Sequence, residues 1–120
     1  MIPAEKWRRV RGTPYEASDL GRIRRAEGGQ GCRAGHVIRS YVVQTKTTAY
    51  RKLHISVGGC VTTHWEHRLV ATAWHGPAPF EDAQVDHLNG DTMDNTPPNL
   101  EWTDRSTNIN RAIARKAGRV

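Results

Sequence analysis

Four side chains in the C-terminal half could together hydrolyse a phosphodiester bond, namely Asp86, His87, Asn99 and Asn108. Such hydrolysis needs an activated water molecule, neutralised charge on the phosphate and a stabilised leaving oxygen. An imidazole can accept the proton of the water near neutral pH, while a carboxylate oxygen and an amide oxygen can bind a hard cation such as Mg²⁺. Aspartate and asparagine are also frequent turn formers. On residue type alone there is therefore an alternative, in which Asp86, Asn99 and Asn108 do no more than shape loops and His87 is an ordinary surface histidine.

The elements that must position these side chains follow from hydrophobic spacing. A helix is expected from His64 to Trp74, because its apolar residues fall on one side of a helical period, and His75-Gly76-Pro77 should end it. A short strand around Val85 then leads into the Asp-His pair. The segment 88–98 is rich in Asn, Gly, Asp and Pro, which predicts a loop.

A returning strand and a final helix complete this region. Asn99–Trp102 has the pattern of a strand that pairs back onto the one before the loop. Asp104 or Ser106 can cap a helix that runs through Asn108 towards Gly118. The predicted order is therefore strand, loop, strand, helix.

The N-terminal half has the pattern of short β-strands separated by turns. The runs are Trp7–Val10, Gly21–Arg25, His36–Thr45, Tyr50–Val57 and Cys60–Thr63. Gly58-Gly59, between the last two runs, is a two-residue turn of the kind that closes a β-hairpin. We expect one small antiparallel sheet, with a mobile glycine-rich loop at Ala26–Gly35.

Charge is unevenly distributed along the chain. Residues 1–52 carry a net charge of +8, residues 53–104 carry −7 and residues 105–120 carry +5, which gives +6 in total. Two basic blocks on either side of an acidic one would suit a protein that binds a polyanion on both sides of a pocket for a divalent cation. A solvated surface with uneven charge is the plainer alternative.

Length and composition set the outer limits. The 120 residues suit one compact domain with at most a thin extension. No stretch of about 18 apolar residues and no secretory signal is present, so we expect no membrane association and a cytoplasmic location. Cys32 and Cys60 are far apart without a CxxC partner, which favours free thiols.

The C-terminal motifs resemble those of HNH nucleases. The matching residues are Val85-Asp86-His87-Leu88-Asn89-Gly90-Asp91, Asp94-Asn95, Pro98-Asn99-Leu100-Glu101-Trp102 and Asn108. They are most similar to the His-Asn-Asn variant of bacteriophage and intron-encoded homing endonucleases. His67-Arg68-Leu69-Val70-Ala71 resembles the helix that usually precedes the motif in these proteins.

The preceding residues resemble the small NUMOD4-like module that is commonly fused before this motif. They are Trp7, Val10, Gly12 and the stretch from Tyr15 to Arg25. The resemblance implies a β-rich, DNA-contacting module over residues 1–63 and a nuclease domain with a leading helix over residues 64–120. The implied fold class is α+β, with a small antiparallel β module followed by a ββα-metal nuclease fold.

The same resemblance implies a role for each residue of the motif. His87 is expected to be the general base, and Asp86 and Asn108 are expected to bind the metal. Asn99 should brace the loop and so orient the base. Asn108 departs from the commonest pattern, which has a histidine there. Because an amide oxygen is a hard, uncharged donor, it favours one Mg²⁺ or Mn²⁺ per active site over Zn²⁺.

Six arginines are expected to contact DNA, and they are Arg22, Arg24, Arg25, Arg68, Arg111 and Arg115. Arg22 and Arg24 alternate along a strand and so share a face. Arg111 and Arg115 are one helical turn apart, near the face of Asn108, where they could bind phosphate. For Arg68 a solvated helix face is an equal alternative.

Three further polar residues near the motif are expected to have structural roles. His67 sits on a helix beside apolar residues and is expected to be a hydrogen-bonded structural histidine. Asn89 and Asn95 are expected to shape the loop without touching metal.

These patterns predict a phage-type or mobile-element DNA endonuclease that acts on double-stranded DNA in the host cytoplasm. One base and one metal per chain predict a nick in one strand, so a double-strand break would need two chains or two encounters. A homodimer or a protein partner could supply specificity. The main alternative is a catalytically silent DNA-binding or phage regulatory protein on the same scaffold. An RNA nuclease, or an interaction protein with an acidic partner, is a second alternative.

Overall fold

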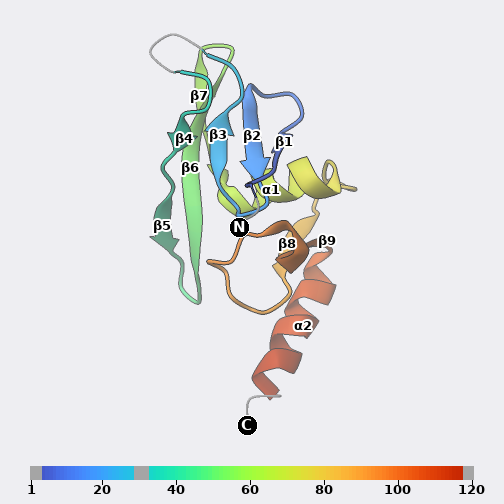
Figure 1. The fold of residues 1–120 in the computed structure, drawn as a ribbon. Coiled ribbons are helices and arrows are strands. Elements are labelled where there is room, and N and C mark those ends of the chain that lie inside the picture. Colours follow the sequence, from blue (N-terminus) through green and yellow to red (C-terminus); the bar gives the residue numbers. More distant parts are fainter. Residues whose placement is uncertain (1–3, 29–32, 118–120) are drawn as a thin grey trace.

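The computed structural model describes residues 4–28 and 33–117 of the chain. Within them, three antiparallel β-sheets and two α-helices form the fold, and the last helix extends away from the sheets (Figure 1). None of the described helices is long and apolar enough to cross a membrane. Part of the predicted glycine-rich loop, residues 29–32, lies outside the described residues together with Cys32. The thiol of Cys60 is exposed and free.

The first sheet is formed by the N-terminal segment. Its four strands are paired in chain order and are β1 (Trp7–Arg9), β2 (Tyr15–Ser18), β3 (Ile23–Arg25) and β4 (Val37–Ile38). Side chains alternate between the two faces of a strand, so Tyr15 and Ala17 are buried while Glu16 between them is partly exposed. Ile23 of β3 joins them in the core.

The second sheet contains the long hairpin that the sequence predicted. Its strands are β5 (Tyr41–Gln44), β6 (Ala49–Val57) and β7 (Cys60–Trp65), in that order. Gly58 and Gly59 form the turn between β6 and β7 with φ angles of 59° and 81°. Glycine adopts this left-handed region without the steric cost that a Cβ atom adds. The predicted hairpin is confirmed.

The expected single strand from His36 to Thr45 is wrong. The chain leaves the first sheet after Ile38 and enters the second at Tyr41, so the run is divided between β4 and β5. The expectation of one sheet is therefore also wrong. At Arg39-Ser40 the sequence has a single serine and no glycine or proline, which is too weak a turn signal to reveal the break.

The C-terminal region follows the predicted order. Its elements are α1 (Glu66–His75), β8 (Gln84–His87), the 3₁₀ turn η1 (Pro97–Asn99), β9 (Leu100–Thr103) and α2 (Arg105–Ala117). Helix α1 begins later than predicted, because Trp65 still pairs with Lys52 as the last residue of β7. Asn99 ends η1 and is not part of the returning strand.

Asp104 is the residue that caps α2. Its Oδ1 accepts a hydrogen bond of 2.7 Å from the backbone N–H of Thr107, and its Oδ2 accepts one from the Thr107 hydroxyl. Both bonds lower the pKa of the Asp104 carboxyl, the backbone bond most. Of the two predicted capping residues, Asp104 is therefore the one used.

All three sheets and α1 contribute to one hydrophobic core. Its buried residues are Val10, Tyr15, Ala17, Ile23, Leu53, Ile55, Leu69, Val70, Ala71, Val85 and Leu100. Two hydrogen bonds reinforce these contacts. Trp74 Nε1 of α1 donates to the carbonyl of Ala17 at 3.0 Å, and the Tyr15 hydroxyl accepts from the Ser56 N–H at 2.9 Å. The two parts that the sequence analysis separates after residue 63 therefore pack around the same core.

The turn between β2 and β3 packs directly on the loop that follows β8. Gly21 has a φ of +84°, and a Cβ atom at this position would lie 2.8 Å from the backbone oxygen of Asn95. Real Cβ atoms do not come this close to a carbonyl oxygen. Glycine is therefore required at residue 21 both by backbone conformation and by the neighbouring loop.

We expect Gly21→Ala to lower the free energy of unfolding by about 2–4 kcal/mol, because left-handed strain adds to a steric clash. Gly12→Ala is the matched control. Gly12 has a φ of +81°, but a methyl group added there would have nothing within 4 Å. This change should cost only about 1–2 kcal/mol, the strain alone. Urea unfolding of both variants measures the difference, and equal losses would show that Gly21 does not hold the loop.

Candidate active site

Asp86 and His87 lie side by side at the end of β8, and both are buried. They pair with Glu101 and Leu100 of β9, which fixes the register of this two-stranded ribbon. Neighbouring side chains of a strand point to opposite faces. Asp86 accordingly contacts a residue of α2, while His87 contacts residues of α1 and of the loop after β8.

The His87 ring is held by a hydrogen bond from the loop. Its Nε2 lies 2.8 Å from Oδ1 of Asn95, and Nδ2 of Asn95 donates to Oε1 of Glu66 at 2.9 Å. Glu66 is the first residue of α1, so three separate elements meet here. Asn95 and Glu66 are functional candidates that sequence reasoning missed. The Asp94-Asn95 pair in the motif was the available signal, but it was read as loop-shaping only.

Asn99 fastens the loop between β8 and β9 at both of its ends. Its Oδ1 accepts from the backbone N–H of Asn89 at 2.9 Å, and its Nδ2 donates to the carbonyl of Asp94 at 2.9 Å. Its own carbonyl accepts from the N–H of Leu88 at 2.8 Å. One buried side chain thereby closes the loop across its base.

Asp94 adds a second set of bonds inside this loop. Its carboxylate accepts from the hydroxyl and N–H of Thr96 and from the amide of Asn89. The Thr96 hydroxyl has the largest effect in lowering the pKa of this carboxyl. The carboxylate is therefore ionised at neutral pH and organises the loop.

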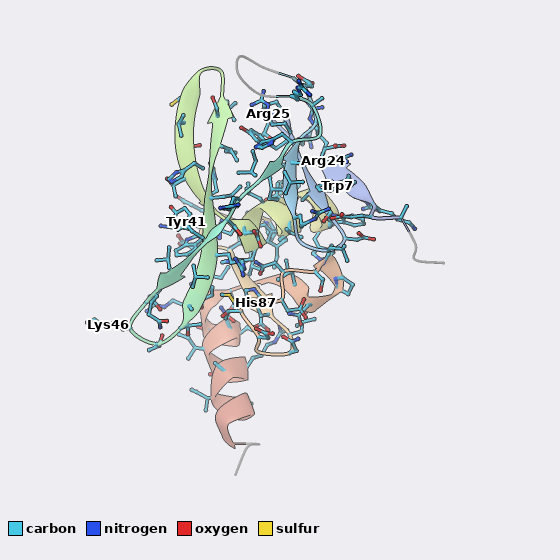
Figure 2. All side chains as sticks on the ribbon, turned by 60° about the vertical axis from the view of Figure 1, so that its left-hand side comes forward. Trp7, Arg24, Arg25, Tyr41, Lys46 and His87 are labelled. Carbon is cyan, nitrogen blue, oxygen red and sulfur yellow. The ribbon has the colours of Figure 1, made fainter. Side chains whose placement is uncertain are left out.

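Asn108 and Asp86 line the same cavity, which has a volume of about 340 Å³. Its walls come from the turn between β5 and β6, from β8, from the following loop and from α2, and His87 also lines it. Figure 2 shows His87 below the sheets, with Lys46 marking the tip of the β5–β6 hairpin. Nδ2 of Asn108 donates to Oε1 of Gln84 at 3.0 Å, which leaves Oδ1 as its donor atom for a cation.

Arg111 is a residue of α2, and its side chain contacts both strands of the β8–β9 ribbon. Its Nη1 is 3.0 Å from Oδ2 of Asp86, and its Nη2 is 3.3 Å from Oε1 of Glu101. The bond to Asp86, followed by the one to Glu101, raises the pKa of the guanidinium. The side chain of Arg115 lies outside the described part of the structure.

The N-terminal arginines have local acidic partners, and Arg22 lines a pocket together with Glu66 and Asn95. Arg22 forms an ion pair with Glu5. Arg24 forms one with Glu16 at 2.9 Å and stacks 4.0 Å from the centre of the Trp7 ring. Figure 2 shows Arg24 and Trp7 on the first sheet, well separated from His87.

The remaining two predicted arginines also have local partners. Arg25 donates to the Tyr15 hydroxyl at 3.1 Å and lies over its ring. Arg68 donates to the carbonyl of Ala83 at 2.9 Å and lies over the ring of Trp102. Each guanidinium is therefore positioned by an aromatic side chain.

His67 is buried against His87, and the hydrogen bond that we expected is missing at its Nδ1 within the described part of the chain. Its ring centre lies 5.1 Å from that of His87, 5.4 Å from that of Tyr50 and 6.0 Å from that of Trp65. No described residue is a hydrogen-bond partner of its buried Nδ1. The three neighbouring rings therefore hold His67 by packing.

The donor set suits a hard divalent cation. Among the described residues, no three His, Cys, Asp or Glu side chains gather as a metal site. The cavity instead brings together one buried carboxylate, Asp86, and one amide, Asn108. Oxygen donors of this kind are preferred by Mg²⁺ and Mn²⁺, and they do not make the nitrogen and sulfur set that zinc favours.

Sequence comparison places the C-terminal part among known proteins. Residues 64–109 match the family described as HNH endonuclease. Over 48 residues the chain is 42% identical to an uncharacterised HNH endonuclease of Acanthamoeba polyphaga mimivirus, and this stretch covers 39% of this chain and 12% of that protein. The chain thus spans only about an eighth of the relative's length. The predicted resemblance to HNH nucleases is confirmed for this segment.

Structural comparison extends the likeness to most of the chain. The fold is similar to that of the HNH homing endonuclease I-HmuI, solved in a study of DNA binding and cleavage, with a TM-score of 0.69 and 24% identity. The match covers 92% of this chain and 59% of that one. The predicted α+β class, with N-terminal antiparallel strands before a β-hairpin and helix, is confirmed. The NUMOD4-like nature of the first module stays a prediction.

The buried His67 should make the protein less stable in acid. Desolvation, followed by the nearby His87 and Arg68, lowers the pKa of His67 from 6.5 to about 3. Between these two values the unfolded chain binds a proton that the folded chain does not. The contribution of His67 to the free energy of unfolding is therefore fully present above the pKa that the residue has in the unfolded chain. It is lost progressively as the pH falls below that pKa. The group accounts for a loss of about 2 kcal/mol between about pH 7 and about pH 5.

His67→Phe tests this expectation, because it keeps an aromatic ring and removes the titrating group. Its free energy of unfolding, measured with urea at each pH, should fall by about 2 kcal/mol less than that of the wild type over the same range. Parallel pH profiles for the two proteins would contradict the assignment.

Proposed function

We propose that this chain, whose residues 64–109 match the HNH endonuclease family, is a metal-dependent DNA endonuclease that hydrolyses phosphodiester bonds. The observation that carries the proposal is the cavity shared by Asp86, His87 and Asn108. It brings an imidazole and two oxygen donors together from β8 and α2. This is the set of groups that phosphodiester hydrolysis requires.

In this proposal His87 is the general base. It lies at the cavity wall with its ring fixed by Asn95 on one side and by the edge-on ring of His67 on another. A fixed imidazole can accept the proton of an attacking water without first rotating into position. Asn99 supports this role indirectly, because it closes the loop that carries Asn95.

Asp86 and Asn108 would hold one divalent cation, and their oxygens favour Mg²⁺ or Mn²⁺. Such a cation would neutralise charge on the phosphate and stabilise the leaving oxygen. Arg111 now occupies one oxygen of Asp86. Once that carboxylate has another positive partner, the guanidinium can turn to a phosphate, for which its planar fork is suited.

The proposed substrate is double-stranded DNA, contacted by the module of residues 1–63 as well as by the nuclease part. The similar protein I-HmuI is described as binding and cleaving DNA. Arg22, Arg24 and Arg25 carry positive charge on the first sheet, and Arg68 and Arg111 carry it near the cavity. Each ion pair with Glu5 or Glu16 can be exchanged for one with a phosphate.

A single base and a single cation site per chain should cut one strand, so we propose a nickase of the phage or mobile-element type. A double-strand break would then need two chains, either as a homodimer or in successive encounters. Action in the cytoplasm of a bacterial host follows if the gene is carried by a phage. The alternative of a silent DNA-binding protein predicts the same DNA contacts without cleavage.

The proposal predicts that the purified protein converts supercoiled plasmid into open circles with Mg²⁺ or Mn²⁺ and has no activity in EDTA. His87→Ala should slow cleavage by roughly 10²-fold or more at an unchanged Kd for DNA, because general-base catalysis is typically worth this much. Agarose-gel assays measure the rate and filter binding measures the Kd.

His54→Ala is the matched control, since His54 is an exposed histidine on β6 outside the cavity. It should cut plasmid at the wild-type rate. Cleavage in EDTA would remove the metal assignment, and binding without cleavage under all conditions would favour the silent alternative.

The N-terminal arginines predict the salt dependence of DNA binding. Each phosphate contact adds about 0.9 to the slope of log affinity against log salt concentration on duplex DNA. Replacing Arg22 and Arg24 together with glutamine should therefore reduce the slope by nearly two units, measured by fluorescence anisotropy over a salt series. A slope that does not change would show that this face of the first sheet binds something else.

A further inference from the structure

Three buried side chains form a hydrogen-bonded chain that ends on His87. Glu66 is 8% exposed, Asn95 3% and His87 5%. They come from the start of α1, from the loop after β8 and from the end of β8. The bonds measure 2.9 Å from Asn95 Nδ2 to Glu66 Oε1 and 2.8 Å between Asn95 Oδ1 and His87 Nε2.

The direction of this chain is set by Glu66. A carboxylate oxygen accepts hydrogen bonds, and the amide end of Asn95 that faces Glu66 is its NH₂ group. The carbonyl end of Asn95 then faces His87. A carbonyl oxygen only accepts, so Nε2 of His87 must carry a proton and donate it. The reversed amide would place its oxygen against the carboxylate in a buried site, which is unfavourable.

We propose that Glu66 and Asn95 are positioning residues that hold neutral His87 as its Nε2–H tautomer, so that Nδ1 is the atom that receives the proton of the water. The inference rests on the proposed function of His87 as general base. A neutral imidazole has one protonated and one unprotonated nitrogen, and a hydrogen bond at one nitrogen selects the other as the base. Neither Glu66 nor Asn95 needs to touch DNA or metal.

The surrounding packing keeps Asn95 in this place. Gly21 of the first sheet lies directly against its backbone, and Asn99 bonds to the carbonyl of the preceding Asp94. The His67 ring meets the His87 ring at an interplanar angle of 68°. Both the amide and the imidazole are therefore restrained from turning over.

A charge exchange between Glu66 and Asn95 tests the proposal. Asn95→Asp places a second carboxylate against Glu66 in a buried site and should slow cleavage at saturating DNA by about tenfold or more. Glu66→Gln should slow it less, because glutamine can offer either end to Asn95. In the double variant Glu66→Gln/Asn95→Asp, the new amide can donate to the new carboxylate, whose other oxygen can accept from Nε2–H of His87. Each bond again joins one donor to one acceptor, so most of the lost rate should return.

The tautomer itself is read by NMR, without DNA or metal. Two-bond ¹H–¹⁵N correlations of ¹⁵N-histidine-labelled protein distinguish the two neutral tautomers, and His87→Ala identifies the His87 signal. Spectra at mildly alkaline pH keep imidazoles neutral. Wild type and the double variant should show Nε2–H at His87, whereas Asn95→Ala should show a mixture.

The two readouts separate this inference from the proposed function. An Nδ1–H tautomer in the wild type, or no recovery in a folded double variant, would overturn the positioning role even if the protein cuts DNA. An Nε2–H tautomer in a protein that never cuts DNA would instead count against His87 as a base. The wild-type spectrum decides the tautomer even if Asn95→Asp fails to fold.

Discussion

The burial of two polar side chains at the end of β8 is the constraint on which the rest of the structure depends. A buried carboxylate and a buried imidazole are stable only where partners replace the water that they lose. Because Asp86 and His87 point to opposite faces of a short ribbon, no single element can supply both sets of partners. Helix α2 provides Arg111 for one, and the loop with α1 provides Asn95 and Glu66 for the other. The helices are thereby tied to one strand end.

The first sheet takes part in this arrangement although it contributes no residue to the cavity. Its β2–β3 turn lies against Asn95 through Gly21, and its strand β2 accepts a hydrogen bond from Trp74 of α1. Arg22 lies in the same turn, and Arg24 lies on β3. The first sheet is therefore in direct contact both with the loop beside His87 and with α1.

Local patterns predicted the elements well, and tertiary contacts were the part that they could not supply. Spacing and turn chemistry predict the strand that leads into Asp86-His87, the hairpin at Gly58-Gly59 and the α1 helix. The structure contains all three. The bond between Glu66 and Asn95 joins residues 29 positions apart, so neither residue type nor period reveals it. The division of His36–Thr45 between two sheets depended likewise on long-range pairing. The roles assigned to Asp86, His87, Asn99 and Asn108 stay predictions.

The ion pair between Arg111 and Asp86 shows how one residue can serve both a folded protein and a reactive site. A buried carboxylate without a positive partner would be strongly destabilising, so Arg111 stabilises Asp86 as the protein stands. The guanidinium itself is partly exposed, with 37% of its side-chain surface accessible, and its second contact to Glu101 is longer at 3.3 Å. In the proposed function, Arg111 would leave once another cation compensates Asp86. That exchange would move a positive charge from the protein's own carboxylate to the place where a phosphate would lie, and Asp86 would keep a positive partner throughout.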